Sequence, residues 1–184
     1  MASVIDIFSD AHWAGCKTAR KSTSGGDAVL GRCCVKSWSK TQGTVAQSSA
    51  ESELIATVRG ATEGIGLISL AQDLGLSLLV RLHVDASAAP GIIERRGVGR
   101  VRHLDVGALW LQEQALRRAV EFVKVKGTSN PADLMTKHLE GPKFRTFSER
   151  LGYDTREGRH ELAPETARLP IECHRAWVAG RGDH

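Results

Sequence analysis

Apolar residues recur at three- and four-residue spacing along residues 54–68, and this stripe constrains the fold more than any other feature of the chain. Its members are Leu54, Val58, Ala61, Ile65 and Ile68. Such spacing places one apolar face along a helix, which we expect to run from Ser49 to about Gly75. Ser48, followed three residues later by Glu51, is typical of a capping box, in which each side chain satisfies a backbone amide of the other. The sequence therefore predicts one long amphipathic helix with a well-marked start.

Three short β-type segments precede this helix. Residues 4–9, 27–30 and 33–39 are rich in the β-branched and apolar residues that favour strands. The stretches between them, 10–15 and 21–26, are rich in turn formers. We expect a three-stranded antiparallel meander, with Asp10 just after the first strand.

The chain beyond the helix alternates between strand and helix patterns. Residues 79–85 and 120–126 have the apolar character of strands, whereas 87–94, 104–118, 131–138 and 142–151 favour helices. A strand followed by a helical crossover implies parallel pairing. The expected fold class is α/β, with a mixed five-stranded sheet of three antiparallel and then two parallel strands and with flanking helices. We expect one domain over residues 1–152 and an irregular tail over 153–184, where periodicity is lost and charges, Pro and Gly collect.

Composition narrows the classes of function only modestly. The chain has 184 residues, 41% of them hydrophobic and 25% charged, which fits a single globular domain with a tail. No apolar run approaches the roughly 20 residues that span a membrane, so we expect no membrane partner. A net charge of +4 permits a polyanionic partner without identifying one. None of the four cysteines forms a C-x-x-C pair, so neither a zinc site nor a disulfide framework is indicated.

Four acidic residues stand where expected elements begin or end: Asp10, Glu53, Asp85 and Asp133. Ligands of open α/β sheets bind beyond the carboxyl ends of the strands, so Asp10 and Asp85 would converge if their strands are parallel neighbours. Clustered carboxylates repel one another unless divalent cations hold them together, and oxygen ligands suit magnesium. Scattered acids in a chain with 21 Asp and Glu are commonly surface groups, so pattern alone leaves both interpretations open.

An ordered series of short motifs resembles the RNase H domain of copia-type retrotransposon Pol polyproteins. The motifs are SDAHWAG at 9–15, RKSTSG at 20–25, SWSK at 37–40, AQSSAESELIA at 46–56, VDASAA at 84–89, RHLD at 102–105 and NPADLMTKHL at 130–139. Each is weak by itself, but their common order and spacing over about residues 4–152 is specific. Two family features are changed: His12 stands where Asp is frequent, and Gly26 where an aromatic residue is frequent.

The resemblance implies an RNase H-like fold and a site that binds two magnesium ions, for which manganese can substitute. The implied catalytic and metal-binding residues are Asp10, Glu53, Asp85 and Asp133. The implied reaction is attack of water on a phosphodiester in the RNA strand of an RNA–DNA hybrid, with metal ions activating the water and stabilising the departing 3′ oxygen. Recognition would rest on the 2′-hydroxyl and the shape of the hybrid, with little base readout.

The choice of Glu53 over Glu51 needs a separate argument. Side chains that are two residues apart on a helix point in directions that differ by about 200°, so only one of these carboxylates can face the site. Glu51 suits the capping box, and ELIA at 53–56 resembles the helix signature of the family. We therefore favour Glu53 as the ligand.

Candidate nucleic-acid contacts lie in two segments. Arg95, Arg96, Arg100 and Arg102 form a basic run whose guanidinium groups can pair with phosphate oxygens. Arg100, Arg102, His103 and Asn130 are the contacts that we select. A solvated loop is an equally good interpretation of the basic run.

Three rival interpretations remain. The chain can be a degenerate remnant of an element that keeps the fold and at most binds nucleic acid, although all four acids are present. It can be another nuclease of the same superfold, integrase-like or exonuclease-like, because fold alone does not fix chemistry. It can be an unrelated basic binding module, whose acids would lie scattered. On the RNase H interpretation we expect reverse transcriptase and integrase segments of a larger polyprotein as partners; the sequence does not distinguish a cytoplasmic from a nuclear site of action.

Overall fold

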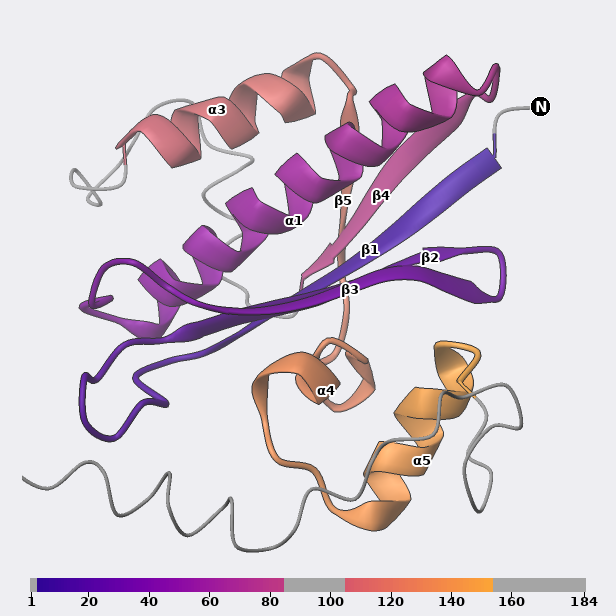
Figure 1. The fold of residues 1–184 in the computed structure, drawn as a ribbon. Helices are drawn as coiled ribbons and strands as arrows, with labels where there is room; N and C mark the ends of the chain where they lie inside the picture. Colours follow the sequence, from indigo (N-terminus) through magenta and orange to yellow (C-terminus); the bar gives the residue numbers. More distant parts are fainter. Residues whose placement is uncertain (1–2, 85–104, 154–184) are drawn as a thin grey trace, which may run out of the picture. The chain divides into compact units, whose positions relative to one another are not determined.

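The structure is a computed structural model that describes residues 3–84 and 105–153. Its strands form one five-stranded sheet in the order β3-β2-β1-β4-β5, with helices on both faces (Figure 1). The strands are β1 (Ser3–His12), β2 (Thr23–Leu30), β3 (Cys33–Thr41), β4 (Leu78–Val84) and β5 (Val120–Lys124). The helices are α1 (Ser49–Asp73), α3 (Asp105–Leu116), α4 (Asp133–Thr136) and α5 (Gly141–Arg150), with a 3₁₀ turn, η2, at Gly127–Ser129.

The predicted pairing of the sheet is confirmed. β1, β2 and β3 form an antiparallel meander, with Phe8 opposite Asp27 and Asp10 opposite Gly25. β4 pairs with β1 in parallel, and β5 pairs with β4 in parallel. The predicted short helix at 87–94 lies outside the described residues, as does most of the predicted tail at 153–184, so both stay predictions.

The predicted loop at 21–26 is wrong, because β2 already begins at Thr23. Gly25 and Gly26 look like turn residues in the sequence, but here they permit close packing. A Cβ at Gly25 would lie 2.6 Å from the Met135 side chain, and one at Gly26 would lie 2.3 Å from the Trp38 ring. Trp38 therefore fills space beside the position where the family frequently has an aromatic side chain.

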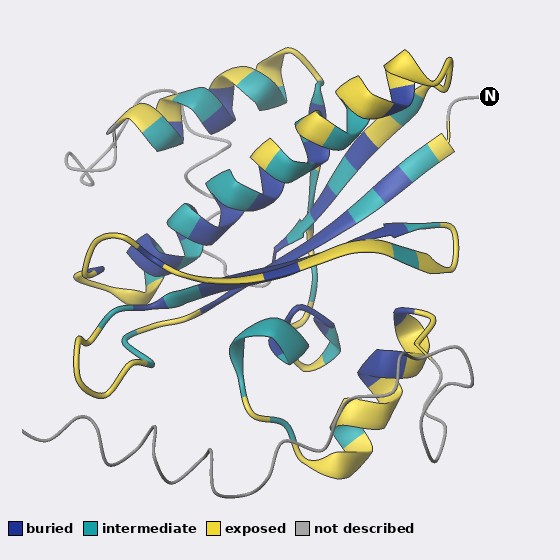
Figure 2. Ribbon diagram, viewed as in Figure 1, coloured by how far each residue is buried: buried dark blue, intermediate teal, exposed yellow. Residues whose placement is uncertain are grey.

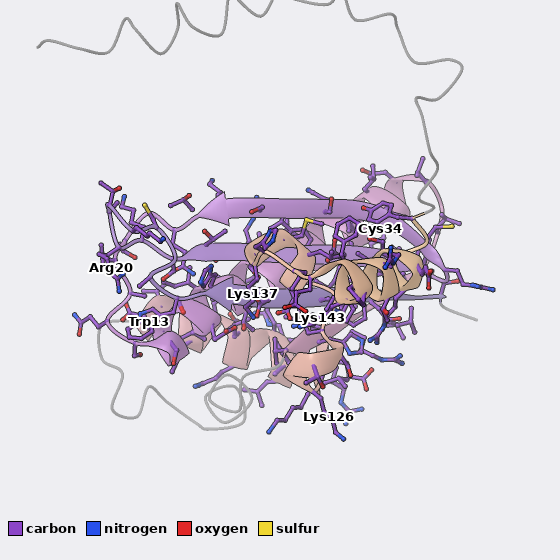
Figure 3. The ribbon with its side chains drawn as sticks, turned by 90° about the horizontal axis from the view of Figure 1, so that it is seen from below. Trp13, Arg20, Cys34, Lys126, Lys137 and Lys143 are labelled. Carbon is purple, nitrogen blue, oxygen red and sulfur yellow. The ribbon has the colours of Figure 1, made fainter. Side chains whose placement is uncertain are left out.

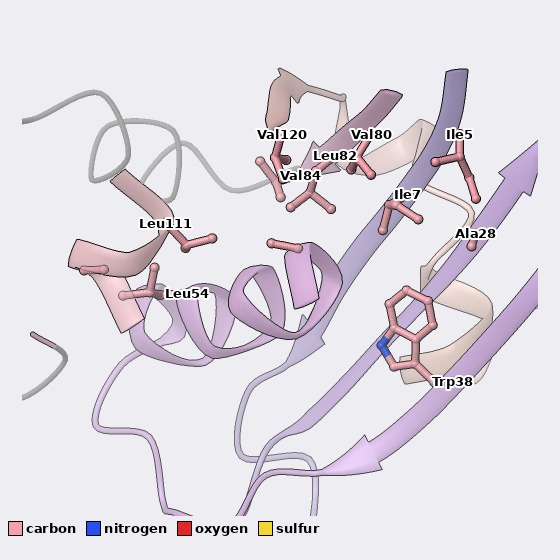
Figure 4. Packing of buried hydrophobic residues seen from close by; sticks show 12 residues of the cluster. Ile5, Ile7, Ala28, Trp38, Leu54, Val80, Leu82, Val84, Leu111 and Val120 are labelled. Atoms are coloured by element: carbon pink, nitrogen blue, oxygen red, sulfur yellow. The ribbon is translucent and has the colours of Figure 1, made fainter. Parts of the chain in front are cut away.

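One face of the sheet is covered by α1 and α3, which enclose the main hydrophobic core (Figure 4). The core combines side chains from the central strands, such as Ile7 and Leu82, with Leu54 of α1 and Leu111 of α3. The side of α1 that faces this core is the apolar stripe that the sequence predicts for residues 54–68. Burying such side chains stabilises the fold by roughly 1.5–3 kcal/mol each.

The opposite face of the sheet carries α4 and α5 (Figure 1). A smaller apolar cluster joins Phe8 of β1 and Val29 of β2 to Ala132 and Leu151. Residues 132–136 and the inner side of α5 are accordingly more buried than the outer side of α5 (Figure 2). This second layer places the late helices against β1, and it decides where Asp133 lies.

α1 is long and apolar enough to span a membrane by length and composition alone. Its buried side, which includes Leu54, Gly60 and Ala61, packs against β1 and β4. The helix also carries charged side chains, among them Glu51, Glu53, Arg59 and Glu63. We interpret α1 as the central helix of this fold.

Candidate active site

The candidate site begins at Asp10, a fully buried residue inside β1. The strand extends to His12, and Asp10 pairs with Gly25 of β2, so Asp10 lies within the strand and does not follow it as the sequence suggested. Because opposite residues of an antiparallel pair share a face, Asp10 shares its side of the sheet with Gly25. The missing side chain at Gly25 lets Met135 and Thr136 of α4 lie directly beside it.

Asn130 positions the second carboxylate. Its amide nitrogen Nδ2 donates a 2.9 Å hydrogen bond to the carbonyl oxygen of Ser9, and its Oδ1 accepts one of 3.2 Å from the Ala132 amide. The side chain is completely buried, so it is committed to anchoring α4 on β1. This differs from the sequence expectation that Asn130 contacts nucleic acid, because a buried and paired amide has no surface to offer.

Two lysines neutralise Asp10 and Asp133. Lys137 Nζ lies 3.0 Å from Asp10 Oδ1 and 2.7 Å from Asp133 Oδ1, and thus bridges them. Lys143 Nζ lies 2.6 Å from Asp133 Oδ2. Thr136 Oγ1 donates a hydrogen bond to Asp10 Oδ2. Both lysines lie on the α4 and α5 side of the sheet (Figure 3).

Burial and charge act in opposite directions on these groups. Burial raises the pKa of the Asp10 carboxyl by more than the Thr136 hydrogen bond and Lys137 lower it, and the neighbouring Asp133 raises it further. Burial alone would lower the pKa of the Lys137 ammonium. Its hydrogen bond to Asp133 and its interactions with Asp10 outweigh burial and hold that pKa above its usual value. Lys137 is therefore charged throughout the physiological pH range.

The other two predicted ligands, Glu53 and Asp85, stay predictions. Glu53 is partly buried in the first turns of α1, and Asp85 lies outside the described residues. Within residues 3–84 and 105–153, no three His, Cys, Asp or Glu side chains are grouped to hold a metal ion. The structure thus brings Asp10 and Asp133 together and leaves the full four-residue site a prediction.

The predicted cap of α1 is present with one difference. Ser48 Oγ accepts a 3.2 Å hydrogen bond from the Glu51 amide, as a capping box requires. Glu51 Oε2 accepts a 2.6 Å hydrogen bond from the Gln47 amide, one residue before the expected partner. This contact supports the assignment of Glu51 to the helix start.

Sequence reasoning missed the lysines. The four-residue spacing of Asp133 and Lys137 predicts an ion pair on a helix, but the partnership with Asp10 depends on the tertiary contact between α4 and β1. The other predicted nucleic-acid contacts, Arg100, Arg102 and His103, lie outside the described residues and stay predictions.

Comparison with solved structures defines the class of fold. LC11-RNase H1, isolated from compost, matches with a TM-score of 0.57 at 15% identity, over 73% of this chain and 93% of that protein. The N-terminal RNase H domain of rv2228c from Mycobacterium tuberculosis matches with a TM-score of 0.50 at 14% identity, over 80% of this chain and 98% of that one. This chain has the RNase H fold.

Curated relatives give the more particular identification, although no protein-family model matches the sequence. The Pol polyprotein of the Nicotiana tabacum transposon TNT 1-94 is 30% identical over 81% of this chain and 11% of its own length. That of the Arabidopsis thaliana transposon RE1 is 28% identical over 80% of this chain and 10% of its own length. The chain spans about a tenth of the length of these relatives. It is a homologue of one segment of copia-type, retrovirus-related Pol polyproteins.

Proposed function

We propose that the chain hydrolyses the RNA strand of RNA–DNA hybrids as the RNase H segment of retrotransposon reverse transcription. The observation that carries this proposal is the pairing of Asp10 and Asp133, which the fold brings from opposite ends of the domain into one buried site. Two buried carboxylates at such a position are costly without cations. Lys137 and Lys143 offset part of this cost, and a function that binds divalent cations would account for the burial of two carboxylates side by side.

The donor set fits divalent magnesium. The Lys137 ammonium places a positive charge between Asp10 and Asp133, which supports this place as one where a metal cation could bind. Asp10 and Asp133 would hold the ions from the sheet and from α4, with Glu53 and Asp85 completing the set; Mn²⁺ would suit the same oxygens. When bound, two such ions would supply the charge that activates water and stabilises the leaving 3′ oxygen. Asn130 keeps Asp133 beside Asp10, and Thr136 orients the Asp10 carboxylate.

The proposed substrate rests on the comparisons. LC11-RNase H1 has been solved with an RNA/DNA hybrid and matches this chain in that complex with a TM-score of 0.51 at 13% identity, over 72% of this chain and 93% of that one. The Pol relatives are far longer than this chain. We therefore propose that reverse transcriptase and integrase segments of one polyprotein are its partners.

Cleavage of an end-labelled RNA–DNA hybrid tests the proposal. We expect the purified chain to cut the RNA strand in magnesium, to stop in EDTA, and to leave double-stranded DNA of the same sequence intact. No cutting by a folded chain would overturn the nuclease assignment. Hybrid binding by such an inactive chain would then favour the degenerate remnant.

Two substitutions in α1 separate catalysis from helix capping. We expect Glu53→Gln to lower hybrid cleavage by roughly a hundredfold or more, because a neutral amide is a weak ligand for magnesium. We expect Glu51→Gln to retain cleavage and to lower the free energy of unfolding by about 1 kcal/mol, since the contact with Gln47 weakens. Cleavage rates and urea unfolding of both variants check this. The reverse pattern would transfer the ligand role to Glu51.

A further inference from the structure

Lys137 holds a position that the proposed reaction does not explain. It follows directly after α4, where its amide donates to the Asp133 carbonyl oxygen at 2.9 Å and continues the helical turn. Figure 3 shows Lys137 beside α4, and its ammonium contacts one carboxylate oxygen of Asp10 and one of Asp133. Lys137 is thus fixed at the site by the backbone that carries Asp133.

The contacts of Lys137 differ from those of its neighbour Lys143. Lys137 takes one oxygen from each carboxylate, whereas the ion pair of Lys143 at this site is with Asp133 Oδ2. Asp10 and Asp133 are almost fully buried, with side-chain exposures of 1% and 3%, while Lys137 retains 36%. The Lys137 side chain is therefore partly exposed to solvent, whereas the carboxylates that it contacts are not.

A magnesium ion and the Lys137 ammonium would repel each other if both lay against the same pair of carboxylates. A magnesium ion held by Asp10 and Asp133 would compete with Lys137 for the Oδ1 atoms, since the Oδ2 atoms are engaged by Thr136 and Lys143. In its absence, those buried carboxylates would repel each other if no other cation were present. Lys137 supplies that charge from within the chain.

We propose that Lys137 is a built-in counter-cation that keeps Asp10 and Asp133 paired and competes with magnesium for their oxygens. This inference rests on the proposed function, because it assumes that magnesium binds these carboxylates. It assigns Lys137 a positioning role: the ammonium preserves the site until a divalent ion displaces it toward solvent. The affinity of the site for magnesium is then set by this competition as well as by the four acids.

Magnesium titration of the full chain at pH 8 tests the proposal, with Lys137→Met as the variant and calorimetry as the readout. We expect Lys137→Met to bind Mg²⁺ roughly tenfold tighter than the unsubstituted chain, because one charge-assisted contact to each carboxylate no longer competes. In EDTA the same variant should melt at a lower temperature, and saturating Mg²⁺ should restore more of its stability than it adds to the unsubstituted chain.

Lys143→Met is the matched control. It removes the same charge from the same neighbourhood but leaves the bridge between Asp10 and Asp133 in place, so its gain in Mg²⁺ affinity should be clearly smaller. If Lys137→Met does not fold in EDTA, Lys137→Gln keeps a hydrogen-bond donor there without the charge and should show the same tighter binding.

Weaker or unchanged Mg²⁺ binding by the Lys137 variants would overturn the proposal, as would an equal gain in Lys143→Met. The proposed function fails separately, through the lack of hybrid cleavage by the unsubstituted chain. Retained cleavage with unchanged Mg²⁺ affinity would therefore reject the counter-cation alone. No measurable Mg²⁺ binding by any of these proteins would reject both the competition and the metal site.

Discussion

Asp10→Asn is expected to lower the rate of RNA–DNA hybrid cleavage by about a thousandfold or more. Asparagine keeps the size of the side chain and can still accept the hydrogen bond from Thr136, but it loses the contact with Lys137. The pairing of β1 with β2 and the anchoring of α4 through Asn130 are left intact. The substitution removes the negative charge at the centre of the proposed magnesium site. A thousandfold loss corresponds to about 4 kcal/mol of transition-state stabilisation, which is in the range expected for losing metal assistance. Single-turnover cleavage in magnesium measures the effect.

Asp6→Asn is the matched control for this substitution. Asp6 lies four residues earlier in the same strand and faces the same side of the sheet, but its carboxylate contacts His83 Nε2 at 2.7 Å and Arg81 Nη1 at 3.6 Å. We expect its cleavage rate to stay within a few-fold of the unsubstituted chain. If Asp10→Asn cuts hybrids as fast as Asp6→Asn, Asp10 is not part of the catalytic site.

The sequence predicted the elements of the sheet and its mixture of antiparallel and parallel pairing well, because the signals for them lie in short segments of the chain. The apolar stripe at 54–68 identifies α1, and the strand-to-helix crossover indicates the parallel pairing of β4 with β5. The start of β2 could not be read in the same way. Gly25 and Gly26 have the local character of a turn, and only the packing of Met135 and Trp38 against them explains why they lie in a strand.

Only those parts of the candidate site that local sequence motifs mark could be predicted. The motifs around Asp10 and Asp133 identified two carboxylates that the structure brings together. The bridge through Lys137 and the burial of Asn130 required the docking of α4 on β1, which no spacing along the chain encodes. Glu53 and Asp85 remain predictions as ligands.

A second buried carboxylate lies on the same side of the sheet as Asp10 but, within residues 3–84 and 105–153, lacks the ion pair and hydrogen bond that Asp10 has. Asp27 of β2 lies opposite Phe8 and is completely buried. Neither carboxylate oxygen has a hydrogen-bond partner in the part of the chain that the structure describes. Burial raises the pKa of Asp27 to about 7. Asp27 is therefore neutral in the folded chain at mildly acidic pH and must ionise inside the protein at alkaline pH.

This shift makes the stability of the chain depend on pH. In the unfolded chain Asp has a pKa of about 3.9, so between about pH 4 and pH 7 the folded state holds a proton that the unfolded state has released. The free energy of unfolding then falls as pH rises through this window, and the loss is complete above the folded pKa. The direction is opposite to that of an ordinary ion-paired carboxylate.

Asp27→Asn should remove this dependence. Asparagine is neutral at every pH but equally unpaired, so at pH 5 it carries a similar desolvation penalty. Between pH 5 and pH 8 we expect the variant to gain about 3 kcal/mol over the unsubstituted chain, since roughly two pH units of the window, at 1.36 kcal/mol each, lie in that interval. Urea unfolding of both proteins at the two pH values measures the difference.

Glu63→Gln provides a control with a shift of the opposite sign. Burial acts to raise the pKa of Glu63, but Lys36 and Arg59 outweigh it and hold that pKa below its usual value. The stabilising contribution of Glu63 is present above its unfolded pKa and is lost only as pH falls through the folded pKa. Its effect should therefore be the same at pH 5 and pH 8. A constant difference between Asp27→Asn and the unsubstituted chain at both pH values would contradict this prediction. Asp27 would then not titrate between pH 5 and pH 8, which would mean that its carboxylate is hydrogen-bonded or hydrated in the folded chain.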